Sequence, residues 1–289
     1  PAPRGRLAGG TSRPVPAGAT ITVVTYNVLR GFGDRLNDLT LEDRLSLLAA
    51  ALAEVDPDVV ILQEVSLTPA SRHGSVAERL RDMLNAATPH GGPYGSAVAM
   101  AHGSRMISFF EGSAILSRYA IESAETIGYR AQSLLPPERR VALRVVLRGE
   151  RGPVVVVGTH LTNVDVRRHG VLVRERQARE LVERDPSWPL VIGGDFNAVP
   201  DSAAVASLRG GGMVDAWAAA RPGDDGFTSL AGAVTDPGAR AVARIDYLFV
   251  RGARVVSAEP FFALPGRGPD GLPLWASDHV GVMARIALP

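Results

Sequence analysis

Two apolar runs near the start of the chain end on polar side chains. Glu64 ends the run VVILQE, where strand periodicity favours an apolar residue or a turn. A buried carboxylate is costly unless it meets a cation or several hydrogen-bond donors. Its oxygens would suit Mg²⁺ or Mn²⁺, which prefer oxygen ligands, although a lone Glu at a strand end is more often a surface residue. Asn27 ends ITVVTYN; its amide could bind a metal or a phosphoryl oxygen, or simply form a turn.

Two further segments, GGDFNAVP and SDH, combine several reactive side chains. The first places Asp195 and Asn197 two residues apart after a buried strand, where they could orient a water molecule or form an ordinary turn. The second places Asp278 beside His279, so that one could face a metal and the other a substrate. A histidine is a good general base when a carboxylate holds its other ring nitrogen. Asp246, in RIDY, is a candidate for that carboxylate.

The remaining histidines are weaker candidates. His160 follows the apolar run VVVVGT, a position at which a histidine is more often structural. Glu111, in FFEGSAILSR, could orient His160. The other four histidines stand in polar or loop-like contexts and are assigned no role: His73, His90, His102 and His169.

Short apolar, β-branched runs predict most of the strands, several of them buried on both faces. The predicted strands are 21–29, 58–65, 107–117, 140–147, 153–161, 189–197, 244–250 and 280–288. Capping-box patterns at Thr40–Asp43 and Ser75–Glu78 predict two helix starts, and residues 168–184 form an amphipathic pattern. Strands that follow one another after short turns predict antiparallel hairpins. The mixture indicates two packed sheets with helices outside.

One pattern occurs twice. Strand TYNVL, a helix and strand VILQEV in the first half correspond to strand GTHL, a helix and strand VIGGDFN in the second. Ligands in α/β proteins gather at the carboxyl ends of strands. If the two units face each other, five polar residues converge on one cleft: Asn27, Glu64, His160, Asp195 and Asn197.

Composition limits the class of protein and the kinds of site that the chain can form. The chain has 289 residues, a net charge of +1 and no cysteine, which excludes disulfides and thiolate metal sites. Its basic residues are all Arg, and no dense basic run indicates a nucleic-acid patch. No segment approaches the roughly 20 apolar residues of a membrane span, so we expect a soluble protein without stable membrane insertion. Residues 1–20 are predicted to be a flexible leader and 21–289 a single catalytic domain. The compartment stays open, and a start at Pro1 leaves room for a removed export signal.

Seven short motifs together resemble the endonuclease/exonuclease/phosphatase superfamily, whose fold is that of deoxyribonuclease I and neutral sphingomyelinases. In order they are TYNV, LQE, GSAILSR, THL, GDFN, RIDY and SDH, spread over residues 25–279. Each is weak alone, but seven in the family's order are not expected by chance. The resemblance implies an α/β fold: a four-layer α/β sandwich of two packed mixed β-sheets flanked by helices, with one cleft.

The resemblance also implies a metal site. Glu64 would be the main ligand of a Mg²⁺ or Mn²⁺ ion, with Asn27 and Asp278 assisting. Whether one or two ions bind is left open.

Catalytic roles follow from the same resemblance. His279 would be the base that activates water for in-line attack, paired with Asp246. Asp195 and Asn197 would orient the nucleophile and the phosphoryl group, and His160 would contact phosphate.

The substrate is narrowed only in part. LQE is followed by Val-Ser and His160 is present, which disfavours the abasic-site endonuclease branch, and RIDY replaces the Cys-Asp-Arg run of inositol phosphatases. The leading prediction is a phosphodiesterase acting on a small molecule, a nucleic acid or a lipid headgroup. A DNA or RNA nuclease, a sphingomyelinase-like lipid phosphodiesterase and a phosphomonoesterase stay open, as does a non-catalytic phosphate-binding module. We expect a monomer.

Overall fold

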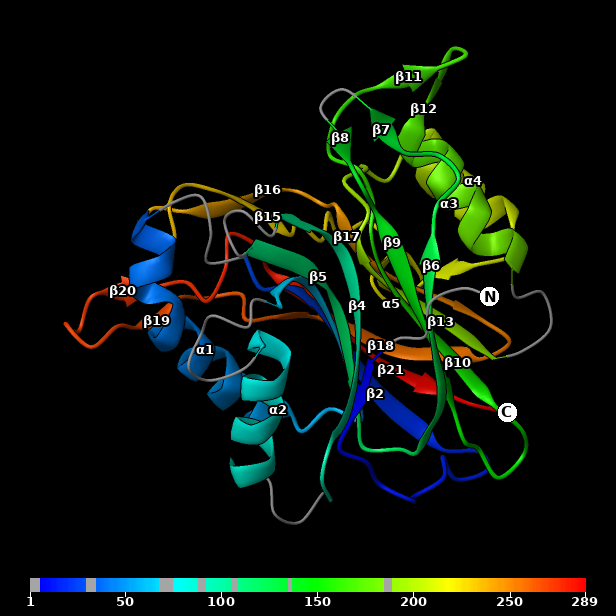
Figure 1. Ribbon diagram of the computed structural model, residues 1–289, viewed down its shortest axis with the longest axis horizontal. Coiled ribbons are helices and arrows are strands. Elements are labelled where there is room, and N and C mark those ends of the chain that lie inside the picture. The colour runs from blue at the N-terminus through cyan, green and yellow to red at the C-terminus, as the bar shows by residue number, and fades with distance from the viewer. Residues whose placement is uncertain are drawn as a thin grey trace.

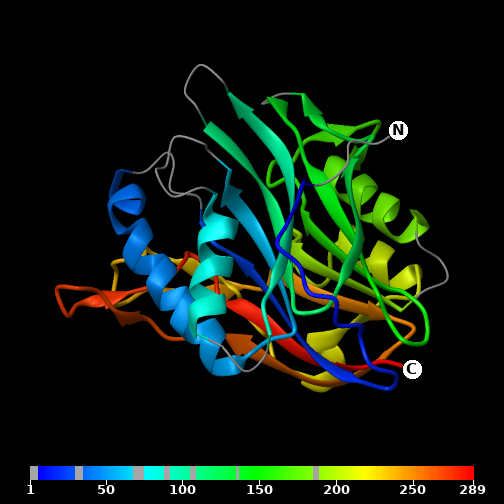
Figure 2. The same cartoon turned by 60° about the horizontal axis from the view of Figure 1, so that its bottom comes forward.

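The computed structural model describes residues 6–29, 35–67, 75–87, 92–104, 109–134, 137–184 and 189–289. Within these ranges, two large β-sheets stack face to face and helices cover their outer faces (Figure 1, Figure 2). The stacking follows from the strand sequences, because runs that are apolar on both faces must be covered on both faces.

The first sheet has seven strands in the order β1-β4-β5-β3-β2-β21-β18. Their bounds in that order are Arg6–Ala8, Gly95–Ser104, Phe109–Ser117, Val59–Ser66, Thr20–Asn27, Gly281–Ala287 and Arg254–Phe261. β2 and β3 run parallel, and every other neighbouring pair in this sheet is antiparallel.

The second sheet has six strands in the order β14-β17-β13-β10-β9-β6. Their bounds in that order are Val214–Asp215, Asp246–Arg251, Leu190–Asp195, Val154–His160, Val141–Leu147 and Ile121–Gly128. Only β10 and β13 run parallel in this sheet. Each sheet therefore contains one parallel pair, formed by the two strands of one strand–helix–strand unit.

Helices form the outer layers. α1 (Arg35–Val55) and α2 (Val76–Ala87) pack on the first sheet, and α3 (Val173–Arg184) and α4 (Ala203–Gly210) pack on the second, as Figure 2 shows. The short α5 (Ala216–Ala220) contacts β17 and β18. A third apolar core fills the space between the sheets. These four layers confirm the predicted sandwich. Within the described residues, no helix combines the length and apolarity needed to cross a bilayer.

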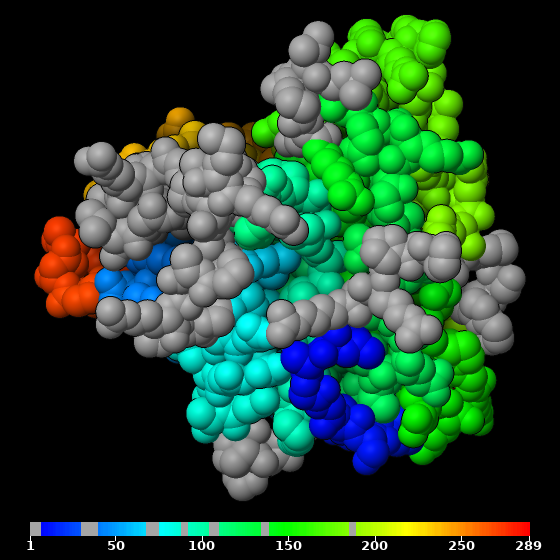
Figure 3. Space-filling model, viewed as in Figure 1, coloured from blue at the N-terminus to red at the C-terminus, as the bar shows by residue number. Residues whose placement is uncertain are grey.

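Four two-stranded hairpins complete the fold. They are β7–β8 (Ser133–Leu134 with Pro137–Glu138), β11–β12 (Arg167–Arg168 with Val171–Leu172), β15–β16 (Ser229–Ala231 with Arg240–Ala243) and β19–β20 (Gly266–Arg267 with Pro273–Leu274). In the space-filling view the β19–β20 hairpin projects at the left edge of the molecule (Figure 3).

Of the two predicted capping boxes, the one before α2 is confirmed and the one at Thr40 is not. The capping box before α2 is confirmed: Ser75 Oγ accepts from Glu78 N at 3.3 Å, and Glu78 Oε2 accepts from Ser75 N at 3.0 Å. α1 already begins at Arg35, so Thr40 lies inside the helix and does not cap it. α3 begins at Val173 instead of residue 168, because residues 167–172 form the β11–β12 hairpin.

Residues 6–19, part of the predicted flexible leader, pack on the rest of the chain. β1 pairs antiparallel with β4, and Val15 is only 2% exposed. Val15 N donates to Arg148 O at 2.8 Å, and Val15 forms a bridge with Gly149. Composition predicts a flexible leader because this segment is rich in Pro, Gly and Ala. Its one valine, Val15, gives no sign in the sequence that it is buried.

Candidate active site

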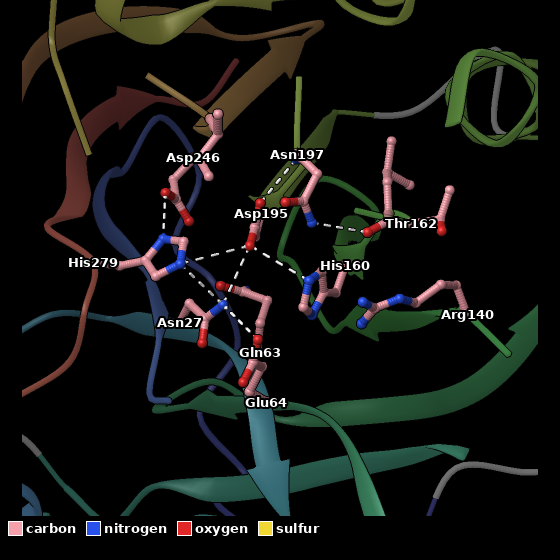
Figure 4. Close-up of polar contacts among 12 residues, drawn as sticks. Asn27, Gln63, Glu64, Arg140, His160, Thr162, Asp195, Asn197, Asp246 and His279 are labelled. Carbon is pink, nitrogen blue, oxygen red and sulfur yellow. Dashed lines mark hydrogen bonds and ion pairs between the residues drawn. The ribbon is translucent and has the colours of Figure 1, made fainter. Parts of the chain in front are cut away.

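The site lies where the parallel pair of one sheet faces the parallel pair of the other. β2 packs on β13 and β3 packs on β10 across the inter-sheet core. Glycines permit this close approach: a Cβ on Gly193 would lie 2.7 Å from Ile61 Cδ1, and one on Gly158 would lie 2.9 Å from Ile61 Cγ2. The carboxyl ends of all four strands therefore meet, and their terminal side chains point toward one another (Figure 4).

A bulge in β3 turns Glu64 toward the cleft. Pairing with β5 shifts register between Leu62 and Val65, and Glu64 has a φ of 53°, in the left-handed region. Such a conformation costs a non-glycine residue about 1–3 kcal/mol and is common at functional sites. It brings Glu64 Oε1 to 3.2 Å from Nδ2 of Asn27, a fully buried residue at the end of β2. The two residues predicted as metal ligands therefore lie side by side.

Asp195, at the end of β13, occupies the centre of the cluster. Its Oδ2 accepts from Asn27 Nδ2 at 3.2 Å and lies 3.4 Å from His160 Nε2 and 3.8 Å from His279 Nε2. Burial, followed by the nearby charges of Asp246 and Glu64, raises the pKa of Asp195 to about 7, although His279 and the hydrogen bond from Asn197 N–H act in the opposite direction. One carboxylate oxygen thus faces an amide and two imidazoles.

Asn197 lies in a turn after β13, one of the two interpretations that its spacing from Asp195 leaves open. Its φ of 48° turns the chain, and Asp195 Oδ1 accepts from Asn197 N at 2.8 Å. Asn197 Nδ2 donates to Leu161 O at 3.0 Å, so the loop after β13 is tied to the loop after β10. Arg174 of α3 donates to Asn197 O and fixes the turn from outside.

His279 and Asp246 form the predicted pair. His279 Nδ1 lies 2.8 Å from Asp246 Oδ2, and both residues are buried. Burial by itself lowers the pKa of His279, but the carboxylates around it, Asp246 first, outweigh burial and raise the pKa well above 6.5. The bond on Nδ1 leaves Nε2 directed at Asp195 and Asn27, toward the centre of the cluster.

Thr228 joins the two halves of this pair, and sequence reasoning missed it. Its Oγ1 accepts from the backbone N–H of Ile245 and of Asp246, each at 3.1 Å, and its carbonyl accepts from Val280 N at 2.6 Å. Thr228 is 2% exposed. The start of β17 and the residue after His279 are thus bonded to one threonine. A single threonine before a hairpin carries no sequence signal for such a role.

Asp278 lies at the rim of the cluster. Its side chain is 42% exposed, and its Oδ1 is 3.9 Å from His279 Nε2. Asp278 and His279 therefore both reach the cleft, because the chain bends before β21 begins.

Glu111 lies farther along the cleft. Its Oε1 is 4.0 Å from Arg140 Nη1 and 3.9 Å from His102 Nε2. Arg140, 3% exposed and just before β9, is drawn on the same side of Asp195 as His160 in Figure 4. Sequence reasoning missed this cation, although the antiparallel pairing of β9 with β10 brings the start of β9 to the His160 end of β10.

The donor chemistry fits a divalent cation. Glu64, Asp195 and Asp246 bring three carboxylates close to one another; burial first, and then the charges of the other two carboxylates, raise the pKa of Asp195. Ligand atoms of Asp195, Asp246 and His279 lie within 4.8 Å of one another. However, His279 Nδ1 is already bonded to Asp246, and Mg²⁺ prefers oxygen. A divalent cation therefore fits better beside the oxygen atoms of Glu64 than beside His279.

Comparisons with known proteins agree with this geometry. The profile of the Endonuclease/Exonuclease/phosphatase family matches residues 24–279, whereas no curated protein gives a significant match. A solved endonuclease/exonuclease/phosphatase family protein from Leptotrichia buccalis has a TM-score of 0.70 and 21% identity, covering 92% of this chain and 99% of that one.

Two further solved structures share the fold at similar identity. D. rerio TDP2, complexed with single-strand DNA product, has a TM-score of 0.65 and 20% identity, covering 93% of this chain and 99% of that one. The catalytic domain of human Nocturnin, with bound sulfate anion, has a TM-score of 0.64 and 18% identity, covering 100% and 99%. These structures establish the deoxyribonuclease I-like sandwich, and the match over residues 24–279 shows that the chain belongs to the endonuclease/exonuclease/phosphatase family.

Proposed function

We propose that the chain is a divalent-metal-dependent phosphodiesterase in which His279 activates the attacking water. Members of the family are usually metal-dependent phosphoester hydrolases, which supports the reaction class. The observation that carries the proposal is the convergence of both βαβ units on Asp195, with His279 held by Asp246 at 2.8 Å beside it.

Glu64 is the main candidate to hold Mg²⁺ or Mn²⁺, with Asn27 and Asp278 assisting. The 3.2 Å contact between Asn27 and Glu64 supports the first pair. The partly exposed carboxylate of Asp278 lies on the same side of His279 as the cleft. A bound cation would supply positive charge for the phosphoryl oxygens. One ion or two is left to measurement.

The protein's own side chains would handle the proton and the substrate. Because Asp246 holds Nδ1, Nε2 of the neutral form of His279 is oriented to accept a proton from water, and this form is gained as pH rises through the raised pKa of His279. Asp195 Oδ2, 3.8 Å from that Nε2, can accept a hydrogen bond from the same water. His160 and Arg140 line the opposite side of Asp195 and would donate to phosphoryl oxygens.

Asn197 and Glu111 take supporting roles in this proposal. Asn197 fixes the two loops that carry Asp195 and His160, and one N–H of its amide is free of the Leu161 bond to reach a phosphoryl oxygen. Glu111 would position Arg140 through their ion pair, in which Oε1 lies 4.0 Å from Nη1.

Hydrolysis of bis-(p-nitrophenyl) phosphate tests the proposal. Turnover is expected with Mg²⁺ or Mn²⁺ and not with EDTA. His279→Asn should lower kcat at least about a hundredfold, the usual contribution of a general base. His169→Asn, at an exposed position, is the matched control and should leave turnover unchanged. Full activity of the His279 variant would refute the role of His279.

The alternatives are separated by substrate. Faster hydrolysis of p-nitrophenyl phosphate would favour a phosphomonoesterase. A side-by-side assay on plasmid DNA, RNA, sphingomyelin, phosphatidylinositol and an inositol phosphate distinguishes nuclease from lipid phosphodiesterase. Binding of phosphate without any turnover would indicate a non-catalytic module. We expect residues 21–289 to act as one catalytic domain and the protein to be a monomer in light scattering.

A further inference from the structure

A basic concavity lies on the outer side of the second sheet, away from the catalytic cluster. It has a volume of about 420 Å³ and is bordered by the end of β6, the β11–β12 hairpin and α3. Four arginines line it: Arg130, Arg168, Arg176 and Arg179. We call these four residues and the space between them the α3 basic pocket. Arg168, Arg176 and Arg179 lie on β11 and α3, and Arg130 joins them from the segment after β6. The β11–β12 hairpin and α3 are neighbours in the fold (Figure 1).

The two acidic residues of the pocket neutralise only one of these arginines. Glu180 and Glu183 each approach Arg130, at 3.7 Å. Glu180 is also held by the backbone, since its carboxylate accepts from the N–H of Arg130 at 2.8 Å and of Ala131 at 3.2 Å. Its negative charge is therefore fixed at the Arg130 side of the pocket.

The positive charges of the other three arginines are not balanced by an ion pair with a described residue. No carboxylate among the described residues lies within 4.0 Å of Arg168, Arg176 or Arg179, and Arg179 has only a long 3.5 Å contact with Ser207 Oγ. A guanidinium stays charged at every working pH and presents paired N–H donors that match two oxygens of a phosphate. Three such groups around one concavity favour an anion with several oxygens.

The size of the pocket indicates more than a single inorganic ion. A volume of about 420 Å³ is within the usual range for sites that bind organic ligands. Arg168 follows His160 by eight residues, so at most roughly 29 Å of chain separates the pocket from the catalytic cluster. At the duplex rise of about 3.4 Å per nucleotide, a strand of about eight nucleotides would span this upper limit.

We propose that the α3 basic pocket is an accessory anion site that binds adjacent phosphate groups, those of an extended substrate or of a free polyphosphate. For an extended substrate this inference rests on the proposed function, because one phosphate of the chain would be held here while another lies at His279. Its contribution would be to affinity and not to the chemical step.

The test uses the full chain in EDTA, so that binding is measured without turnover. The probes are a fluorescent single-stranded oligonucleotide of about twelve nucleotides and inorganic tripolyphosphate. The variant is Arg168→Glu with Arg176→Glu. The matched control is Arg254→Glu with Arg285→Glu, two exposed arginines on the β18–β21 pair of the other sheet, which changes net charge equally.

We expect the pocket variant to bind one or both probes at least about tenfold more weakly, with the control near wild type. For the oligonucleotide, the slope of log affinity against log salt should fall by about 1.4, because two phosphate contacts are lost. Weaker binding of both probes, or of the oligonucleotide alone, indicates that the pocket binds an extended substrate. Weaker binding of tripolyphosphate alone indicates that it binds a free anion. Unchanged affinity for both probes, or an equal loss in the control, overturns the proposal.

Bis-(p-nitrophenyl) phosphate separates this inference from the proposed function. The molecule is too small to reach both sites, so the pocket variant should hydrolyse it within twofold of the wild-type rate. If the wild type does not hydrolyse it, the proposed function fails, whereas the binding result in EDTA still decides on the pocket. If the pocket variant alone loses this activity, the site is not accessory and the inference is refuted.

Discussion

Replacing Thr228 by valine removes one oxygen atom at nearly constant volume. That oxygen accepts from the backbone N–H groups of Ile245 and Asp246 at 3.1 Å each, in a site where Thr228 is 2% exposed. A half-buried donor (Ile245) and a buried donor (Asp246) would lose their partner, which we estimate to lower the free energy of unfolding by about 2–4 kcal/mol. For a chain of this size the melting temperature should fall by roughly 5–15 °C.

The same change should slow catalysis. Thr228 also bonds Val280 through its carbonyl, so a shift of the β17 start relative to this residue would disturb the 2.8 Å contact between Asp246 and His279. We expect kcat on bis-(p-nitrophenyl) phosphate to fall at least about tenfold with KM little changed, when assayed well below both melting temperatures. Thr228→Ser keeps the oxygen and should recover most of the loss in both measurements. A valine variant with wild-type kcat, or a serine variant as impaired as valine, would refute the positioning role.

Three further predictions concern charge and strain. Asp246→Asn should lower the pKa of His279, measured by NMR in metal-free protein, because Asp246 does most to raise it; an unchanged titration would contradict this. Glu64→Gly should be more stable than Glu64→Ala by about 1 kcal/mol in denaturant unfolding, because only glycine adopts a φ of 53° without strain; equal stabilities would mean that the bulge relaxes. Hydrogen bonding to Arg118 lowers the pKa of Asp56 below 3.8, so this pair stabilises the fold above that pH and loses its effect as pH falls through the lowered pKa. Asn tolerates the backbone conformation of Asp56, so Asp56→Asn should be less stable than wild type near neutral pH and equally stable in strong acid. A difference in stability that does not change with pH would exclude the Asp56 charge as its cause.

Most of the sheet strands could be predicted because their signals are local, whereas β4, β6 and β18, which lack a long continuous apolar run, are not predicted. Continuous β-branched runs such as VVVV at residues 154–157 indicate burial on both faces, whatever lies around them. The repeated strand–helix–strand pattern then implies two similar units, and the polar residue that ends each strand implies where their side chains meet. Asn27, Glu64, His160 and Asp195 converge for this reason.

Features that depend on distant partners could not be predicted. The bulge that turns Glu64 into the cleft depends on its pairing with β5, some 50 residues away in sequence. Arg140 reaches the site through strand pairing, and Thr228 does so through bonds to two separate segments. The spacing of Asp195 and Asn197 leaves a turn and a catalytic pair open, and only the structure shows that Asn197 N donates to Asp195 Oδ1 within a turn.

The central claim is that one bound cation at Glu64 and the His279–Asp246 pair act on the same phosphate. Turnover of bis-(p-nitrophenyl) phosphate, titrated with Mn²⁺ for wild type, Glu64→Gln and the exposed control Glu259→Gln, tests it most directly. The account predicts that Glu64→Gln requires far more Mn²⁺ and loses at least about a hundredfold in turnover, while Glu259→Gln follows the wild-type curve. Superimposable Mn²⁺ curves for Glu64→Gln and wild type would contradict it.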